Sequence, residues 1–229
     1  MISRHTLQAE DIVRLLNSFI YGFVDYTFTS HNDSMKILES NSNHKSVLND
    51  VLNVLKAITE EDLIFMFKSQ NRKAKSISET VNLLISEGLK ERGWKKNVPI
   101  FNAESKEIDS AKWKIDFVKN NVSVDIAFNH SGNIISNLVK PVVTYQENEL
   151  KKNNAIAVSI IITATSLLKN AGGFDGAVGE YERYLESLKV MKRLISAPIL
   201  LIGLNAPKTF KIEHKKIGNK KVGVVVELY

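Results

Sequence analysis

The sequence from Trp113 to Asn129, WKIDFVKNNVSVDIAFN, predicts a β-hairpin. Large apolar residues alternate with polar ones on both sides of its centre, and many residues are β-branched or aromatic, which is typical of strands. Asn120 and Asn121 lie between the two runs, and asparagine tolerates the positive φ that a two-residue hairpin turn requires. This turn sets the register and places Asp116 opposite Asp125.

Two carboxylates therefore face each other across the predicted hairpin. Directly opposed side chains in a sheet have Cβ atoms ~5 Å apart, and like charges at that distance destabilise the strand pair. Folding alone would not favour Asp116 and Asp125 in these places. Mg²⁺ would resolve the conflict, because proteins bind it through one or two carboxylates together with phosphate oxygens. The alternatives are a register shifted by one residue, or one aspartate that points into solvent.

Composition and charge limit the kinds of partner that we expect. The chain has 229 residues, and its 31 Lys and Arg against 25 Asp and Glu give a net charge of +6. This charge favours a polyanionic partner, although a solvated basic surface explains it equally well. The absence of cysteine excludes disulfides and thiolate metal sites. Because we find no membrane-spanning run and no signal-peptide pattern, we expect a cytoplasmic protein with no membrane partner.

The sequence lacks the motifs of several other enzyme classes. It contains neither a GxxxxGK[ST] loop nor a GxGxxG fingerprint, so we expect no nucleotide cofactor. It has no GxSxG nucleophile motif, and its five histidines show no zinc-ligand spacing.

The order of the predicted elements indicates the α/β class, with a central mixed sheet flanked by helices and an N-terminal helical portion. Residues 1–75 form that portion, with helices over 6–28 and 44–58, a polar loop over 29–43 and another helix from Thr59. The later elements are a helix over Ser76–Glu91, an edge strand near Val98–Phe101, the central hairpin, a helix from Ile134 broken at Pro141, a strand over Ala155–Thr163, a helix over Asp175–Leu194, a strand over Ile199–Leu204 and a hairpin over 208–228.

These residues resemble a known family, the type II restriction endonucleases of the PD-(D/E)XK superfamily, in its BglII-like branch. The resemblance covers roughly residues 76–204. The Lys- and Asn-rich composition and the length are similar to those of SwaI and PmeI, which recognise AT-rich octameric palindromes. The matching features are a helix ending in Gly93-Trp94, Ile115-Asp116, an acid nine residues later at Asp125, Asn137-Leu138-x-Lys140, an apolar strand, and Phe174-Asp175.

The resemblance implies a restriction-endonuclease-like catalytic core in residues 76–229 and a dimerising, DNA-embracing role for residues 1–75. It implies a homodimer that hydrolyses phosphodiester bonds of double-stranded DNA at a palindromic site with Mg²⁺. Asp116 and Asp125 would match the two acids of the motif, and Ile126 would add its backbone carbonyl to the metal ligands. Ala127 departs from the motif, which most often has lysine there and in the BglII-like branch can have glutamine.

This departure leaves three possibilities open, because alanine can neither position nor deprotonate a water molecule. The predicted register places Lys114 opposite Ala127, so Lys114 could supply the missing catalytic ammonium group, or it could be an ordinary exposed strand lysine. Without a substitute, the protein would be a catalytically inactive, sequence-specific DNA-binding dimer of the same fold. Alternatively, it would be an unrelated α/β protein whose two acids bind structural Ca²⁺ or pair with lysines.

Candidate DNA-binding residues lie in three parts of the sequence. Lysine and arginine contact phosphates, whereas asparagine suits base edges. One basic cluster precedes the helix that begins near Ser76 and another lies on the terminal hairpin, although both would also serve as solubilising surface. The candidates are Arg72, Lys73, Lys75, Asn129, His130, Lys140, Lys215 and Lys216.

Overall fold

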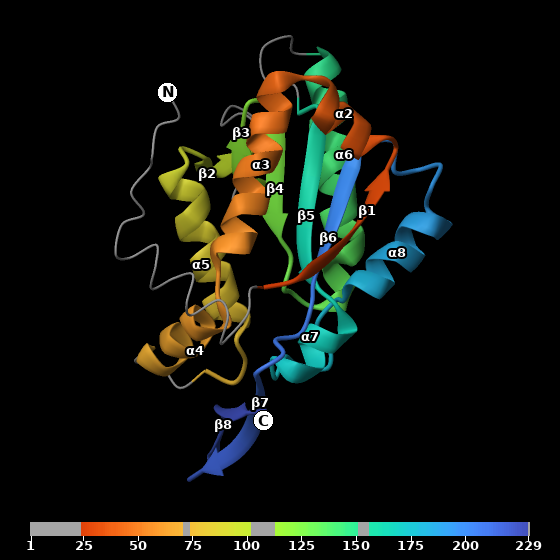
Figure 1. Ribbon diagram of the computed structural model, residues 1–229. Helices are drawn as coiled ribbons and strands as arrows, with labels where there is room; N and C mark the ends of the chain where they lie inside the picture. The colour runs from red at the N-terminus through yellow and green to blue at the C-terminus, as the bar shows by residue number, and fades with distance from the viewer. Residues whose placement is uncertain (1–23, 71–73, 102–112, 151–155, 229) are drawn as a thin grey trace, which may run out of the picture.

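A six-stranded mixed sheet forms the centre of the computed structural model, which describes residues 24–70, 74–101, 113–150 and 156–228 (Figure 1). The strand order is β1-β6-β5-β4-β3-β2. The three central strands are parallel to one another, and each outer strand is antiparallel to its neighbour. The strands are β1 (Tyr26–His31), β2 (Lys95–Pro99), β3 (Lys114–Lys119), β4 (Val122–Ile126), β5 (Val158–Ala164) and β6 (Ile199–Leu204).

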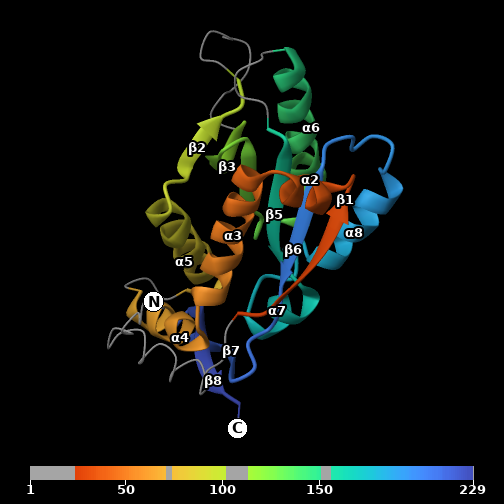
Figure 2. The ribbon, with the colours of Figure 1, turned by 45° about the horizontal axis from the view of Figure 1, so that its top comes forward.

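Helices cover both faces of this sheet (Figures 1 and 2). On one face lie α2 (Ser34–Ser40), α3 (Ser42–Ala57) and α5 (Ser78–Glu91), and on the other lie α6 (Ile134–Leu150) and α8 (Tyr181–Val190). Every residue of β5 and β6 is buried, as expected for parallel strands between two helical layers. The predicted α/β class and both buried strands are confirmed. No described helix is long and apolar enough to cross a membrane.

The terminal hairpin forms a separate two-stranded sheet of β7 (Phe210–Ile217) and β8 (Lys220–Glu227), as predicted. It lies at the end of the molecule where the central parallel strands terminate, next to α4 (Glu60–Ser69) and α7 (Ser166–Ala171) (Figure 1). The His214 imidazole bonds to the carbonyls of Lys75 and Gly173, at 3.0 and 3.1 Å. The Gly223 N–H donates to the carbonyl of Ala74 at 2.9 Å. These bonds attach the hairpin to the segment before α5.

A buried carboxylate holds the chain that leads into this hairpin. Glu60 is 1% exposed and accepts hydrogen bonds from the N–H groups of Lys208 and Thr209 and from the Thr209 hydroxyl. We expect Glu60→Ala to lower the free energy of unfolding by about 2–3 kcal/mol, because three partly buried hydrogen bonds to this carboxylate would be lost together. Urea denaturation would measure the change. Glu61→Ala, in the same helical turn, is the control, and an equal effect of both variants would contradict the prediction.

The N-terminal elements differ from the prediction. Residues 26–28, predicted as helix, and much of 29–43, predicted as loop, form β1 and α2 instead. β1 is an edge strand that pairs with β6, more than half the chain away, and local periodicity carries no signal of such a pairing. Residues 6–23 of the predicted helix lie outside the described residues. β1, α2 and α3 share one sheet and core with residues after 75, and the division of the chain at residue 75 stays a prediction.

Two later helices also have different bounds from those predicted. α6 continues through Pro141, because burial of Ile134 and Leu138 outweighs the cost of about 3 kcal/mol for proline inside a helix. α8 begins at Tyr181 rather than Asp175. The preceding residues use their backbone in β-bridges, Val178 with His130 and Glu180 with Ala164, which exclude helical hydrogen bonding there.

Candidate active site

The central hairpin has the predicted turn and register. Asn120 and Asn121 have φ values of 44° and 63°, so both adopt the left-handed conformation of a two-residue hairpin turn. The pairs that follow are Lys119 with Val122 and, two residues along, Phe117 with Val124. This register directs Asp116 and Asp125 to the same face of the sheet.

The two aspartates are held together by reciprocal hydrogen bonds. The N–H of Ile126 donates to Asp116 Oδ2 at 2.8 Å, and the N–H of Asp116 donates to Asp125 Oδ1 at 3.3 Å. Each carboxylate is therefore positioned by the backbone of the opposite strand. Asp125 is only 6% exposed and Asp116 is half-buried, so neither aspartate points freely into solvent. The observed strand pairs exclude a shifted register.

The electrostatics of this pair favour a bound cation. Burial, and then the negative charge of Asp116, raise the pKa of Asp125 from 3.8 to about 7, while Lys140 lowers it. A buried carboxylate beside a second one is unfavourable when both are ionised. A divalent cation between them would remove that penalty, because it would neutralise both charges.

The backbone of Ile126 offers a third oxygen to such a cation. The N–H and C=O of one strand residue point to the same side, and the N–H of Ile126 points toward Asp116. The N–H of the next residue, Ala127, points away from β3 and donates to the carbonyl of Ile162 on β5 at 2.8 Å. The carboxylates of Asp116 and Asp125 with the Ile126 carbonyl thus form an oxygen donor set that suits Mg²⁺. Within the described residues no third acidic or histidine side chain completes a metal cluster.

Comparison with known proteins now identifies the family. The family model for restriction endonuclease BglII/BglIII matches residues 26–204. The chain belongs to the BglII/BglIII restriction endonuclease family. Two solved structures share 20% sequence identity with it and cover 89% of this chain and 100% of their own: restriction endonuclease BglII complexed with a DNA 16-mer, at a TM-score of 0.59, and free BglII, at 0.50. No curated protein matches the chain.

Family membership makes the protein a type II site-specific deoxyribonuclease and confirms the predicted restriction-endonuclease-like fold. The closer likeness to SwaI and PmeI stays a prediction. The motif position after Ile126 is indeed an alanine without a functional group: Ala127 is buried, and its carbonyl accepts a bond from the Thr163 hydroxyl at 3.0 Å.

No observed strand pair joins Lys114 to Ala127. The pairs of β3 with β4 end at Phe117–Val124, and Lys114 pairs with Pro99 of β2 and is exposed. Its catalytic role stays a prediction that the geometry does not favour. Lys140 of α6 lies closer to the acids, with its Nζ 3.8 Å from Asp125 Oδ1.

A buried polar network fixes α6 against β4 and α8. The Asn137 amide donates to the Tyr184 hydroxyl at 2.6 Å and to Asn129 Oδ1 at 3.1 Å. Burial raises the pKa of Tyr184 to about 12, so the phenol stays neutral. The sequence analysis predicts a helix over Asp175–Leu194 but gives Tyr184 no polar role, so it misses this contact. The available signal is a polar Asn137 beside the apolar Leu138, three residues before Lys140 in the predicted helix.

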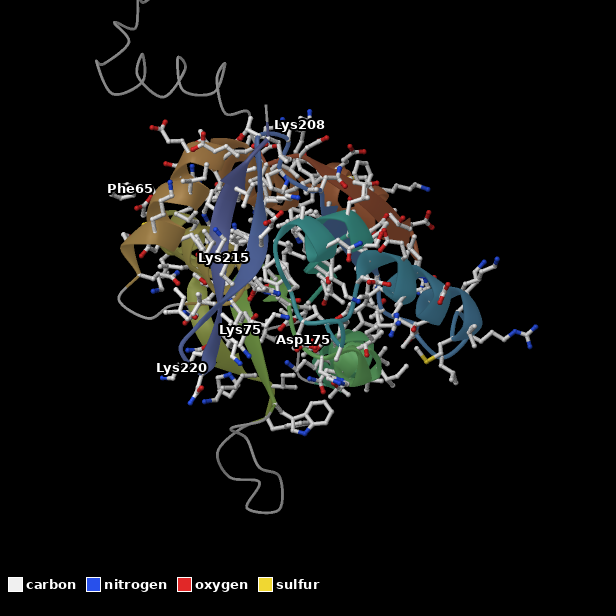
Figure 3. All side chains as sticks on the ribbon, turned by 90° about the horizontal axis from the view of Figure 1, so that it is seen from below. Phe65, Lys75, Asp175, Lys208, Lys215 and Lys220 are labelled. Atoms are coloured by element: carbon white, nitrogen blue, oxygen red, sulfur yellow. The ribbon has the colours of Figure 1, made fainter. Side chains whose placement is uncertain are left out.

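The predicted DNA-binding residues fall into two groups. Asn129 and His130 are exposed just after β4, where His130 Nδ1 accepts the N–H of Gly132 at 3.0 Å. Lys75 and the hairpin lysines Lys215 and Lys216 are exposed at the end of the molecule shown in Figure 3, which labels Lys75, Lys215 and Lys220. Arg72 and Lys73 lie outside the described residues.

A groove connects Lys75 with the terminal hairpin. We call it the basic groove, because its lining has three lysines and one acidic residue; the polar lining residues are Lys75, Ser76, Ser78, Glu79, Asn219, Lys220 and Lys221. The extension of β4 lies near the same end, because the ring of Phe128 packs edge-on against Phe174 with centroids 5.7 Å apart, next to Gly173. Asp125 near the end of β4, Asp116 beside it on β3 and the basic groove therefore lie at one end of the sheet.

Proposed function

We propose that this nuclease hydrolyses phosphodiester bonds of double-stranded DNA with Mg²⁺ held by Asp116, Asp125 and the carbonyl of Ile126. The observation that supports this proposal is the reciprocal bonding that keeps two carboxylates side by side, one of them almost fully buried. Mg²⁺ in such a site supplies charge neutralisation at the phosphate and activation of the attacking water. The water oxygen forms a new P–O bond as one ester P–O bond breaks, and the leaving oxygen is then protonated.

The proposed reaction also bears on the oligomeric state of the protein. Cutting both strands of a palindrome requires two active sites related by a two-fold axis, so we propose a homodimer. Residues 1–75 stay our candidates for the dimer surface and for segments that embrace DNA. An AT-rich octameric site and a cytoplasmic location remain predictions from the sequence.

We assign the basic groove and the exposed lysines beside it to the DNA backbone. In the hairpin, Lys216 pairs directly with Lys221. Opposed like charges destabilise a strand pair, so this arrangement is better explained by a polyanionic ligand than by folding. Phosphate contacts from these lysines would orient DNA, while Asn129 and His130, next to the acids, would lie close to the cleaved strand.

Digestion of a sequenced plasmid with and without Mg²⁺ tests the proposal. We expect fragments with defined ends, which end mapping would assign to one palindromic sequence. Asp116→Asn should cut at least about 10³-fold more slowly, because it removes a negative ligand of the metal while its amide oxygen can still accept the Ile126 N–H.

The outcome also separates the proposal from its alternative, an inactive DNA-binding dimer. Salt-dependent binding to duplex DNA without cleavage in Mg²⁺ would support that alternative. Wild-type cleavage rates in Asp116→Asn would show that the two acids are not the active site.

A further inference from the structure

We infer that Lys140 of α6 takes the place of the lysine that Ala127 lacks and holds its positive charge beside Asp125 and the scissile phosphate. This inference rests on the proposed nuclease function, because it assigns a role within that site. The sequence predicts Lys140 as a DNA-binding residue, and in the structure its ammonium group lies beside the buried Asp125. The two acids come from the hairpin of β3 and β4, and the positive charge comes from the helix α6 that follows it.

The geometry of Lys140 fits that role. Residues alternate between the faces of β4, so Asp125 and Ala127 face the same helical layer, the one that contains α6. Lys140 Nζ lies 3.8 Å from Asp125 Oδ1, with 21% of the lysine side chain and 9% of the aspartate side chain exposed. The ammonium group therefore lies on the face of β4 to which the side chains of Asp125 and Ala127 both point.

The donors of this ammonium group remain available. A distance of 3.8 Å is an ion pair but exceeds the length of a hydrogen bond. In the described part of the chain, Lys140 Nζ donates no hydrogen bond, so its three N–H donors can serve a water molecule or a phosphate oxygen.

The backbone that carries Lys140 is fixed in place. Asn137, one helical turn earlier, bonds to Tyr184 on α8 and to Asn129 after β4. Leu138, the next residue of α6, is fully buried. A charge held by a rigid support stabilises a transition state without reorganisation, which is the condition for effective electrostatic catalysis.

Two other lysines of the central hairpin are less suitable. Lys114 is exposed and its strand partner lies on β2. Lys119 lies at the turn end of the hairpin, where its Nζ donates to Asp50 Oδ2 and to the carbonyl of Arg92, both at 2.7 Å. Of these three lysines, only Lys140 forms an ion pair with an acid of the site.

Single-turnover cleavage of a duplex that contains the mapped site tests the inference. Lys140→Met removes the charge but keeps the length of the side chain, and we expect cleavage to be about 100-fold slower in saturating Mg²⁺. DNA affinity measured in chelator should stay within about 3-fold of wild type, and Lys140→Arg should recover at least about 10-fold of the lost rate. Lys119→Met is the matched control, because it removes an ion pair of similar exposure at the other end of the hairpin, and it should cut at the wild-type rate.

Titration calorimetry with Mg²⁺ alone gives a readout independent of cleavage. Lys140→Met should bind Mg²⁺ at least as tightly as wild type, because a cation that competes for Asp125 is gone. A merely structural role for Lys140 predicts weaker Mg²⁺ binding instead, and a 10-fold loss would overturn the inference. The inference would also be overturned if Lys140→Met cleaved DNA at the wild-type rate. The same holds if Lys114→Met cleaved about 100-fold more slowly than wild type and Lys140→Met did not. A wild-type protein that cuts no DNA is a different result, because it contradicts the proposed function itself.

Discussion

Asp125→Asn is expected to abolish DNA cleavage and, at the same time, to stabilise the metal-free protein. Loss of a negative metal ligand should slow cleavage at least about 10³-fold. The gain in stability arises because the native protein holds a buried carboxylate next to Asp116. An asparagine amide avoids the charge, and its oxygen can still accept the N–H of Asp116.

The direction of the pH dependence follows from the raised pKa of Asp125. Burial raises this pKa most, Asp116 from β3 raises it further, and Lys140 from α6 and the N–H of Asp116 lower it. Tyr184 of α8, whose own pKa is raised by burial to about 12, stays neutral. Below about pH 4 the carboxyl group is protonated in the folded and unfolded states alike. Between about pH 4 and 7 the unfolded state loses its proton first, so the free energy of unfolding falls as the pH rises.

Above pH 7 the folded protein bears the whole penalty of the buried charge. A pKa of about 7 against 3.8 corresponds to a penalty on the order of 4 kcal/mol. Urea unfolding in chelator at pH 5, 6, 7 and 8 should therefore show a falling free energy of unfolding for wild type and a flatter curve for Asp125→Asn. The variant should be the more stable protein at pH 8.

Asp50→Asn is the matched control for this experiment. Asp50 pairs with Lys119 at 2.7 Å in a partly exposed site, so its loss should slightly destabilise the protein at every pH above 5. Added Mg²⁺ should raise the melting temperature of wild type and of Asp50→Asn but not that of Asp125→Asn. Identical pH dependence of wild type and Asp125→Asn would show that the Asp125 carboxylate is not destabilised by its surroundings.

The acids could be predicted from the sequence because the information that places them is local. Asn120 and Asn121 specify the turn, and alternation in the adjoining residues specifies the faces of the strands. Together they set the register that brings Asp116 to Asp125. The uninterrupted apolar runs of β5 and β6 are likewise local, since burial on both faces removes any need for polar residues.

The rest of the site depends on how separate elements pack against one another. Lys140 reaches Asp125 only because α6 packs on the face of β4, and the bonds of Asn137 to Tyr184 hold it there. No periodicity within α6 specifies which strand its polar residues will meet. β1 shows the same limit, since its pairing with β6 joins segments from the two ends of the described chain.

Neutralising the opposed lysines of the terminal hairpin should weaken DNA binding and strengthen folding at once. In Lys216→Gln/Lys221→Gln, two candidate phosphate contacts disappear from the exposed hairpin beside the basic groove. Each phosphate contact contributes about −0.9 to the slope of log affinity against log salt, so the slope should become shallower by about 2. At low salt we expect affinity for duplex DNA to fall about 10–100-fold, while the removed repulsion should stabilise the hairpin by about 0.2–1 kcal/mol.

Lys90→Gln/Lys95→Gln is the control that separates the position of the lost lysines from the loss of net charge. Both residues are exposed, on α5 and β2, so this variant loses the same net charge away from the terminal hairpin. Filter binding or anisotropy over a range of salt concentrations would compare the two variants with wild type. If long-range attraction by net charge explained DNA binding, both variants would lose affinity equally, and the hairpin would have no direct role. A loss of slope confined to Lys216→Gln/Lys221→Gln would place DNA phosphates against the hairpin, because counterion release depends on the lysines that contact the backbone.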